Sequence, residues 1–281
     1  MSDFRLKVFQ SVAKNLSFTK ASQELFVSQP AITKHIQELE ATYQTRLFDR
    51  QGSKISLTES GRLLLEHCER ILEDYKRLEY EMHLLHNEYI GELKLGASTT
   101  IAQYVLPPLL GSFIGKFPQV NLSLLNGNSR EIEAALQEHR IDLGLVEGVF
   151  RLPNLKYTTF LEDELVAVVH SKSRLQLPEE ITPQDLPAIP LVLRERGSGT
   201  LDVIERSLQK HGVKLSSLHV LMYLGSTESI KLFLENSDCM GIVSIRSICK
   251  ELAAGTFRVV EIKDMPMLRD FCFVQLQGQE G

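Results

Sequence analysis

The stretch of sequence that decides the fold runs from residue 17 to residue 50 and reads SFTKASQELFVSQPAITKHIQELEATYQTRLFDR. Its pattern predicts two short helices joined by a tight turn at Phe26 and Val27. Ser17 and Ser28 each stand where a helix N-cap would. Pro30 is tolerated in the first turn of the second helix, because the N–H groups there have no partner within the helix.

The second of these helices has an apolar side and a polar side. Ile32, Ile36 and Leu39 recur at i, i+4 and i+7 and therefore share one side. The opposite side offers the methylene, hydroxyl, ammonium and amide groups of Pro30, Thr33, Lys34 and Gln37. Such groups can contact base edges and phosphates in a major groove of DNA. A small helical hairpin with a solvated polar face would show the same pattern, so this stretch alone leaves both interpretations open.

A β-wing is predicted to follow the two helices. We expect one strand at 46–49, a turn at 50–53 and a second strand at 54–57. Residues 1–58 hold eight Lys and Arg against five Asp and Glu, a local charge of +3, whereas the whole chain has a net charge of −5. A basic N-terminal segment in an otherwise acidic chain is typical of a protein that binds DNA at one end.

One long helix is predicted over residues 58–89. Its apolar residues alternate steps of four and three, which is a heptad seam. They are Leu64, Cys68, Ile71, Tyr75, Leu78, Met82, Leu85 and Tyr89. The helix could pack on its own C-terminal domain, but the narrow seam favours dimerisation between two copies of the chain.

Beyond Gly91 the pattern alternates between strands and helices, which is typical of an α/β domain. We expect strands at 92–97, 121–126, 141–146, 165–170, 189–193, 219–224, 240–243 and 269–274. The helices expected between them lie at 101–117, 129–138, 199–211, 227–236 and 244–254.

Composition narrows the class of protein. A length of 281 residues suits two or three domains, and 43% hydrophobic and 24% charged residues are typical of a globular protein. We expect a cytoplasmic location, because no signal peptide or membrane-spanning run is visible. No nucleophile elbow, P-loop, dinucleotide fingerprint or metal-ligand spacing occurs, so we expect no enzyme, no cofactor and no metal. Cys239 and Cys249 could form a redox switch, but we expect ordinary buried thiols.

Taken together, these motifs resemble the LysR-type transcriptional regulators. The resemblance rests on six stretches in order and at the spacing of that family. They are Phe9 with Val12, residues 18–22, residues 28–33, Leu39 with Glu40, residues 46–50 and residues 57–61. It extends over the whole chain and implies a sequence-specific, DNA-binding transcriptional regulator controlled by a small effector, for which we expect an anion.

The resemblance also implies an architecture. It places a winged helix-turn-helix at 1–58, a dimerisation helix at 59–90 and an effector-binding domain at 91–281. That last domain would be α/β and similar to periplasmic binding proteins, with lobe 1 at about 91–162 and 266–281 and lobe 2 at about 163–265. A homodimer through the helix, and a homotetramer, are implied as partners besides double-stranded DNA.

Two sets of site residues follow. For DNA we expect contacts from Thr19, Lys20, Ser28, Gln29, Pro30, Ala31, Thr33, Lys34, Gln37, Arg50 and Lys54. For the effector we expect the corners where strands end and helices begin, since helix N-termini favour anions. These comprise Ser98, Thr99, Thr100, Gly127, Asn128, Ser129, Arg196, Ser198, Thr200 and Thr227, together with Glu147 at the edge of the cleft.

Several alternatives stay open at this point. Each corner is also an ordinary helix cap, and Glu147 could orient an effector or simply pair with Arg196. The corners look similar to the branch of the family that senses small sulfur anions or amino-acid precursors. A solute-binding or transport-associated module would share the two-lobed half, and an α/β enzyme fused to a DNA-binding head would need a catalytic cluster that the sequence does not contain.

Overall fold

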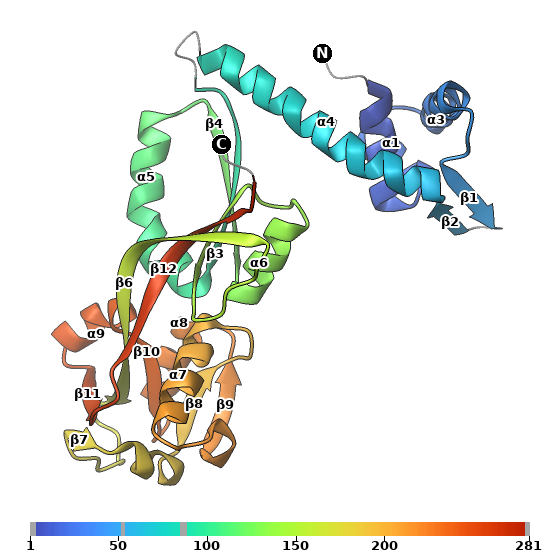
Figure 1. Cartoon of the computed structure of the whole chain (residues 1–281). Coiled ribbons are helices and arrows are strands. Elements are labelled where there is room, and N and C mark those ends of the chain that lie inside the picture. Colours follow the sequence, from blue (N-terminus) through green and yellow to red (C-terminus); the bar gives the residue numbers. More distant parts are fainter. Residues whose placement is uncertain (1–3, 52–53, 85–88, 279–281) are drawn as a thin grey trace. The chain divides into compact units, whose positions relative to one another are not determined.

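The structure is a computed structural model, and it describes residues 4–51, 54–84 and 89–278. The chain forms two compact units, Met1–Ile90 and Gly91–Gly281 (Figure 1). Among the described residues, none of the helices is both long enough and apolar enough to span a membrane.

The first unit is a small helical domain followed by a hairpin and a long helix. Its elements are α1 (Phe4–Asn15), α2 (Phe18–Glu24), α3 (Gln29–Tyr43), β1 (Phe48–Gln51), β2 (Lys54–Leu57) and α4 (Glu59–Leu84). The predicted inner face of α3 is confirmed, because Ile32, Ile36 and Leu39 are all buried in one cluster with Phe9 and Phe48.

The ends of these helices explain where the sequence-based predictions hold and where they fail. Ser17 caps α2 as predicted, since its hydroxyl accepts a hydrogen bond from the N–H of Lys20 at 3.2 Å. Ser28 occupies the N-cap of α3, but its side chain makes no capping hydrogen bond. The first wing strand begins at Phe48 rather than at residue 46, because the N–H of Leu47 is bound by the Glu40 carboxylate at 2.8 Å.

The long helix α4 divides its apolar residues between two environments. Cys68 and Leu72 are buried in the core of the first unit, and the Cys68 thiol donates a hydrogen bond to the carbonyl of Leu6 at 3.3 Å. Ile71, Leu78 and Met82 are exposed. The predicted dimerisation seam is therefore wrong at Cys68, because this side chain packs in the core of its own unit. Its Leu85 lies outside the described residues, and Tyr89 lies beyond the end of α4 at Leu84.

The second unit is built on one mixed sheet whose main path is β4-β3-β5-β12-β6-β10-β8-β9. The strands are β3 (Gly91–Ser98), β4 (Val120–Gly127), β5 (Leu143–Glu147), β6 (Leu155–His170), β7 (Glu180–Ile181), β8 (Leu191–Arg194), β9 (Val220–Leu224), β10 (Met240–Ser244), β11 (Phe257–Ile262) and β12 (Met267–Leu276). β3 runs parallel to β4 and β5, and β8 runs parallel to β9 and β10. Two antiparallel strands, β6 and β12, connect these parallel groups.

Helices cover both faces of each parallel group. They are η1 (Ile101–Val105), α5 (Leu106–Lys116), α6 (Ser129–Gln137), η2 (Pro183–Ala188), α7 (Gly199–Lys210), η3 (Leu215–Ser217), α8 (Thr227–Glu235), η4 (Ile245–Ser247) and α9 (Cys249–Ala253). Successive strand residues point to opposite faces, so Leu145 packs with α5 residues while Val146 packs with α6 residues. Because helices cover both faces of the sheet here, strands such as β8 are almost continuously apolar.

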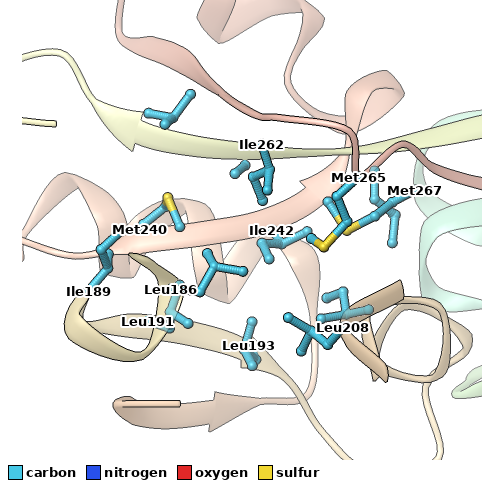
Figure 2. Close-up of a cluster of buried hydrophobic side chains, with 14 of the residues drawn as sticks. Leu186, Ile189, Leu191, Leu193, Leu208, Met240, Ile242, Ile262, Met265 and Met267 are labelled. Carbon is cyan, nitrogen blue, oxygen red and sulfur yellow. The ribbon is translucent and has the colours of Figure 1, made fainter. Parts of the chain in front are cut away.

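The largest core lies around β8, β10 and α7. Figure 2 shows its side chains, among them Leu191 and Leu193 from β8, Ile242 from β10 and Leu208 from α7. Val192, between the two leucines, faces the opposite side and packs in a second cluster with α8. Because side chains on both faces of β8 pack against helices, the strand is held in place, and so is Arg194 at its end.

Several predicted elements need correction. β6 begins at Leu155, ten residues earlier than predicted, and β7 and β11 were not predicted. The first half of β6 was missed because only one of its faces is covered, so polar residues interrupt its apolar pattern. The helix predicted at 101–117 begins with a π-helical turn, Ile101–Val105, and the one at 244–254 is split into η4 and α9.

Candidate functional site

The polar side of α3 is available to a partner. Ser28, Gln29, Pro30, Lys34 and Gln37 are exposed, while Ala31 and Thr33 are half-buried. The Gln29 amide donates to the Thr33 hydroxyl at 3.1 Å, which holds two polar groups of this side in register. Lys34 reaches Glu38 only at 4.0 Å with 76% of its side chain exposed, so it can leave that carboxylate for a phosphate.

The remaining predicted DNA contacts flank this helix. Thr19 and Lys20 are exposed in the first turn of α2. Arg50 and Lys54 belong to the paired strands of the wing, in which Gln51 lies opposite Lys54, but their side chains fall outside the described part of the structure. Residues 52 and 53 of the predicted turn also lie outside it.

In the second unit, the predicted corner after β3 is a buried row of hydroxyls. Ser98, Thr99 and Thr100 are all at most 4% exposed. Ser98 donates a hydrogen bond to the Glu147 carboxylate, and Thr99 donates to the backbone carbonyl of Gly127 at 3.2 Å. Four of the predicted positions therefore meet at the ends of neighbouring parallel strands, where ligands of α/β sheets collect.

Glu147 is paired, but not with Arg196. Its carboxylate lies 3.5 Å from Nη1 of Arg269, while Arg196 is exposed. Arg269 is fully buried, and its Nε donates to the Asp163 carboxylate at 2.7 Å. Its Nη1 also donates to the hydroxyl of Thr200 at 2.9 Å. The guanidinium thus ties β5, the middle of β6 and the start of α7 together.

The N-termini of α6 and α7 meet beside Glu147. Asn128 caps α6 by accepting from the N–H of Glu131 at 3.0 Å, and Ser129 donates to the backbone carbonyl of Glu147 at 2.8 Å. Ser198 caps α7 by accepting from the N–H of Leu201 at 3.2 Å. A Cβ atom on Gly199 would overlap the Glu147 carbonyl, so glycine permits this close approach.

A second arginine, Arg194, lies on the other side of the hydroxyl row. It is 1% exposed and forms a double ion pair with Glu195, at 2.8 Å through Nε and 3.0 Å through Nη2. Its Nη2 also donates to the Thr99 hydroxyl at 3.3 Å, across 95 residues of sequence. The corner after β3 is therefore hydrogen-bonded to the Glu147 carboxylate through Ser98 and to the Arg194 guanidinium through Thr99.

A further polar contact joins η1 to α8. The Tyr104 hydroxyl donates to the Glu228 carboxylate, and Glu228 accepts from Lys231 at 2.9 Å. Burial, together with this hydrogen bond, raises the pKa of Tyr104 well above its usual range. Thr227, the predicted effector residue at this point, is 2% exposed in the first turn of α8.

Where the structure describes the chain, the cysteines and acidic residues form no metal site. Within the described residues, no group of three His, Cys, Asp or Glu side chains could hold a metal ion, and no disulfide is present. Burial raises the pKa of the Cys239 thiol, and the same cause raises that of Cys68 to about 11. Cys249 is exposed, so the expectation of buried thiols is wrong at that one position.

Most of the predicted effector residues come together, and several partners were missed. The hydrogen bonds and ion pairs of the described residues join the Ser98, Gly127, Glu147 and Thr200 corners, but they do not include Arg196. Arg194, Arg269 and Asp163 were not predicted, because their partners lie far away in the sequence. A charged residue ending an apolar strand, as Arg194 ends β8, was the available signal.

Two family models match this chain. A family model described as the LysR substrate binding domain matches residues 86–281, and one described as a bacterial regulatory helix-turn-helix protein of the lysR family matches residues 4–62. The HTH-type transcriptional regulator CysL of Bacillus subtilis (strain 168) is 29% identical over 269 residues, which are 96% of this chain and 89% of CysL.

Two solved structures are similar over much of the chain. Full-length CbnR in complex with its target DNA matches 99% of this chain and 94% of its own, with a TM-score of 0.63; at 23% identity this likeness shows the fold alone. The CcmR regulatory domain of Synechocystis PCC6803 in complex with 2-PG matches 68% of this chain and 89% of its own, with a TM-score of 0.60 and 28% identity.

The helix-turn-helix match favours a DNA-binding regulator over a transport-associated module. The matched families consist of regulators rather than enzymes. The substrate-binding model alone covers more than half of the sequence. The chain belongs to the LysR family of DNA-binding transcriptional regulators, with an N-terminal helix-turn-helix and a C-terminal effector-binding domain.

Proposed function

We propose that the DNA binding of this LysR-type regulator is controlled by a small anion, bound where the buried hydroxyls of Ser98–Thr100 meet Arg194 and the N-termini of α6 and α7. The observation that carries the proposal is the hydrogen bond from Arg194 to Thr99, which brings a buried cation to a corner of hydroxyls. Buried arginine beside hydroxyl donors is chemistry for an oxyanion.

The helices support an anion rather than a cation. The first N–H groups of a helix lack intrahelical partners and carry a partial positive charge of about half a unit. Ser129 and Gly199, the first residues of α6 and α7, both lie against Glu147. An anion at this junction would lie beside the positive ends of both helices and near a guanidinium.

For DNA, we propose that α3 reads the major groove through Gln29, Pro30, Thr33, Lys34 and Gln37. Thr19, Lys20, Ser28, Ala31 and the wing residues Arg50 and Lys54 would contact the adjacent backbone and groove edge. The support is the exposed polar side of α3, opposite its buried apolar side.

We also propose a homodimer, assembling further to a tetramer, acting in the cytoplasm. Two copies would place two recognition helices on successive half-sites. The support is the apolar residues that α4 exposes at Ile71, Leu78 and Met82. The edge strand β9 adds Leu221, Met222 and Tyr223, each between 44% and 46% exposed. Exposed apolar rows of this kind mark interaction surfaces.

The effector proposal is tested by melting the purified full chain with sulfite, sulfate, thiosulfate, O-acetylserine and 2-PG. A ligand at a hundred times its Kd should add about 2.7 kcal/mol to the folded state and raise the Tm. Thr99→Ala should abolish that rise, whereas Thr182→Ala, in a capping box before η2, should not. A rise that survives in Thr99→Ala would place the ligand elsewhere, and no rise with any anion would refute the anionic effector.

A further inference from the structure

The chain between α3 and the wing is held from both sides. On the side of α3, a carboxylate oxygen of Glu40 accepts a hydrogen bond from the backbone N–H of Leu47 at 2.8 Å. Leu47 is 1% exposed and packs in the same core cluster as the apolar side of α3. The residue directly before the first wing strand is therefore tied to the last turn of α3.

On the side of α4, the same backbone is held by Thr58. The N–H of Thr58 donates to the carbonyl of Leu47 at 3.1 Å, and its hydroxyl donates to the carbonyl of Arg46 at 2.7 Å. The Thr58 hydroxyl also accepts from the N–H of Gly61, in the first turn of α4, at 2.9 Å. A Cβ atom on Gly61 would overlap the Leu47 carbonyl oxygen, so glycine permits this close approach. Leu47 thus bonds to α3 through its N–H and to the start of α4 through its carbonyl.

These contacts fix the ends of the wing that adjoin the helices. β1 begins at Phe48, directly after Leu47, and β2 ends at Leu57, directly before Thr58. Phe48 and Leu57 lie opposite each other in the hairpin. Both wing strands therefore start from anchored residues, and we expect the wing and α3 to move together.

A rigid link between two DNA-binding elements increases affinity. α3 and the wing then bind for a single loss of translational and rotational freedom. A wing free to rotate would have to be ordered on binding, and the entropy cost would reduce the affinity gained from its phosphate contacts. The Glu40 charge has the opposite effect, because an acid near a DNA-binding surface repels phosphate.

We propose that Glu40 is a positioning residue for DNA binding, which acts through the N–H of Leu47 to hold the wing where its basic residues meet phosphate. Thr58 is a second positioning residue, which acts on the carbonyls of Arg46 and Leu47. This inference rests on the proposed wing contacts and deepens them by naming the groups that place the wing.

Two substitutions of Glu40 separate its position from its charge. Glu40→Gln removes the charge but keeps an oxygen that can accept from Leu47, so its DNA affinity should match or exceed that of wild type. Glu40→Ala removes the charge and the acceptor together. We expect it to weaken DNA binding by about tenfold or more, the loss for one hydrogen bond to a charged phosphate. The salt slope should become flatter by about one to two, since Arg50 and Lys54 supply up to two phosphate contacts. Equal affinities of the two variants, or a tenfold loss in both, would overturn the inference.

A double-mutant cycle tests whether Glu40 acts through the wing. Fluorescence anisotropy measures the Kd of the full chain for the DNA fragments that wild type selects, at a temperature where circular dichroism shows every variant folded. Arg50→Ala should cost about tenfold in wild type and in Glu40→Gln, but less than about threefold in Glu40→Ala. Lys34→Ala, on α3, is the control and should cost the same factor in all three backgrounds. A merely structural defect would change both costs alike, and an equal cost of Arg50→Ala in every background would overturn the inference.

Thr58 supplies a second pair of variants if Glu40→Ala fails to fold. Thr58→Val removes the hydroxyl at nearly the same shape and should weaken DNA binding with a flatter salt slope. Thr58→Ser keeps the hydroxyl and should restore both; a wild-type affinity and slope in Thr58→Val would overturn the inference.

The outcomes separate the inference from the function beneath it. If Arg50→Ala and Lys54→Ala leave the affinity and salt slope of wild type unchanged, the proposed wing contacts fall and the inference falls with them. If these two variants weaken binding while Glu40→Ala does not, the wing contacts stand and the role of Glu40 falls.

Discussion

Replacing Gly199 by alanine tests the contact that brings α6 and α7 together. The added Cβ would overlap the carbonyl oxygen of Glu147 and press on its side chain. Backbone atoms form this obstacle, so the new methyl group cannot be accommodated by a change of rotamer. The start of α7 must therefore move away from β5, and the junction proposed as the anion site must widen.

The size of the effect follows from packing. Inserting a methyl group into a closely packed site costs about 1–3 kcal/mol. Alanine in place of a helical glycine would by itself be favourable by up to about 1 kcal/mol, so a net loss can only come from the overlap. For a unit of this size, each kcal/mol lowers the Tm by about 2–4 °C.

Scanning calorimetry of the full chain measures this change. Gly225→Ala is the matched control, because a Cβ there meets no atom within 4 Å. We expect Gly199→Ala to melt about 2–12 °C below wild type and to lose its Tm response to anions, while Gly225→Ala stays within about 1 °C. Equal Tm values for the two variants, or an intact anion response in Gly199→Ala, would refute the close approach.

Three further predictions concern the buried charges, the DNA surface and the dimer. Arg269→Met leaves Glu147 buried without a cation and leaves Asp163 with Arg246 alone, whose side chain is 40% exposed, so urea unfolding should show a loss of about 3–5 kcal/mol; a loss below about 1 kcal/mol would contradict the network. Lys34→Ala should weaken binding to DNA selected from genomic fragments. If Lys34 contacts phosphate, the loss should be similar for all sequences and the salt slope flatter by about one; if it contacts a base, the loss should be about 1–3 kcal/mol and specific to one base pair. Lys172→Ala is the control, and a Lys34→Ala affinity equal to wild type would exclude both roles. Leu78→Glu should shift sedimentation toward the monomer without changing helix content, unlike Glu73→Ala, and an intact dimer would place the interface elsewhere.

The parts of the fold that could be predicted are those written in short-range patterns. Ile32, Ile36 and Leu39 lie within three turns of one helix, and their spacing alone identified the buried side of α3. The strands β8 and β10 were found because both faces are covered and the residues are continuously apolar. β11 (FRVVEI) carried a β-branched signal that the prediction overlooked.

The missed parts of the site depend on pairs that are distant in sequence. Arg194 meets Thr99 across 95 residues, and Arg269 meets Asp163 across 106. The position of Arg194 at the end of the apolar strand β8 was the available local signal, and it is a weak one, because charged residues at strand ends are usually solvated. The hydroxyl corner was predictable because turn and cap chemistry is local; the guanidinium that gives it an ionic partner was not.

The proposed control of DNA binding by an effector requires coupling between the effector site and the DNA-binding helix, and thermodynamic linkage measures this coupling. The DNA fragments that wild type selects are titrated with and without the anion that raises the Tm, and the anion is titrated with and without that DNA. Binding free energies require that the anion change the Kd for DNA, and DNA the Kd for the anion, by one common factor, typically 5- to 150-fold. We predict such a factor in wild type and a factor near one in Thr99→Ala. Tight binding of both ligands by wild type, with neither affecting the other, would contradict the account.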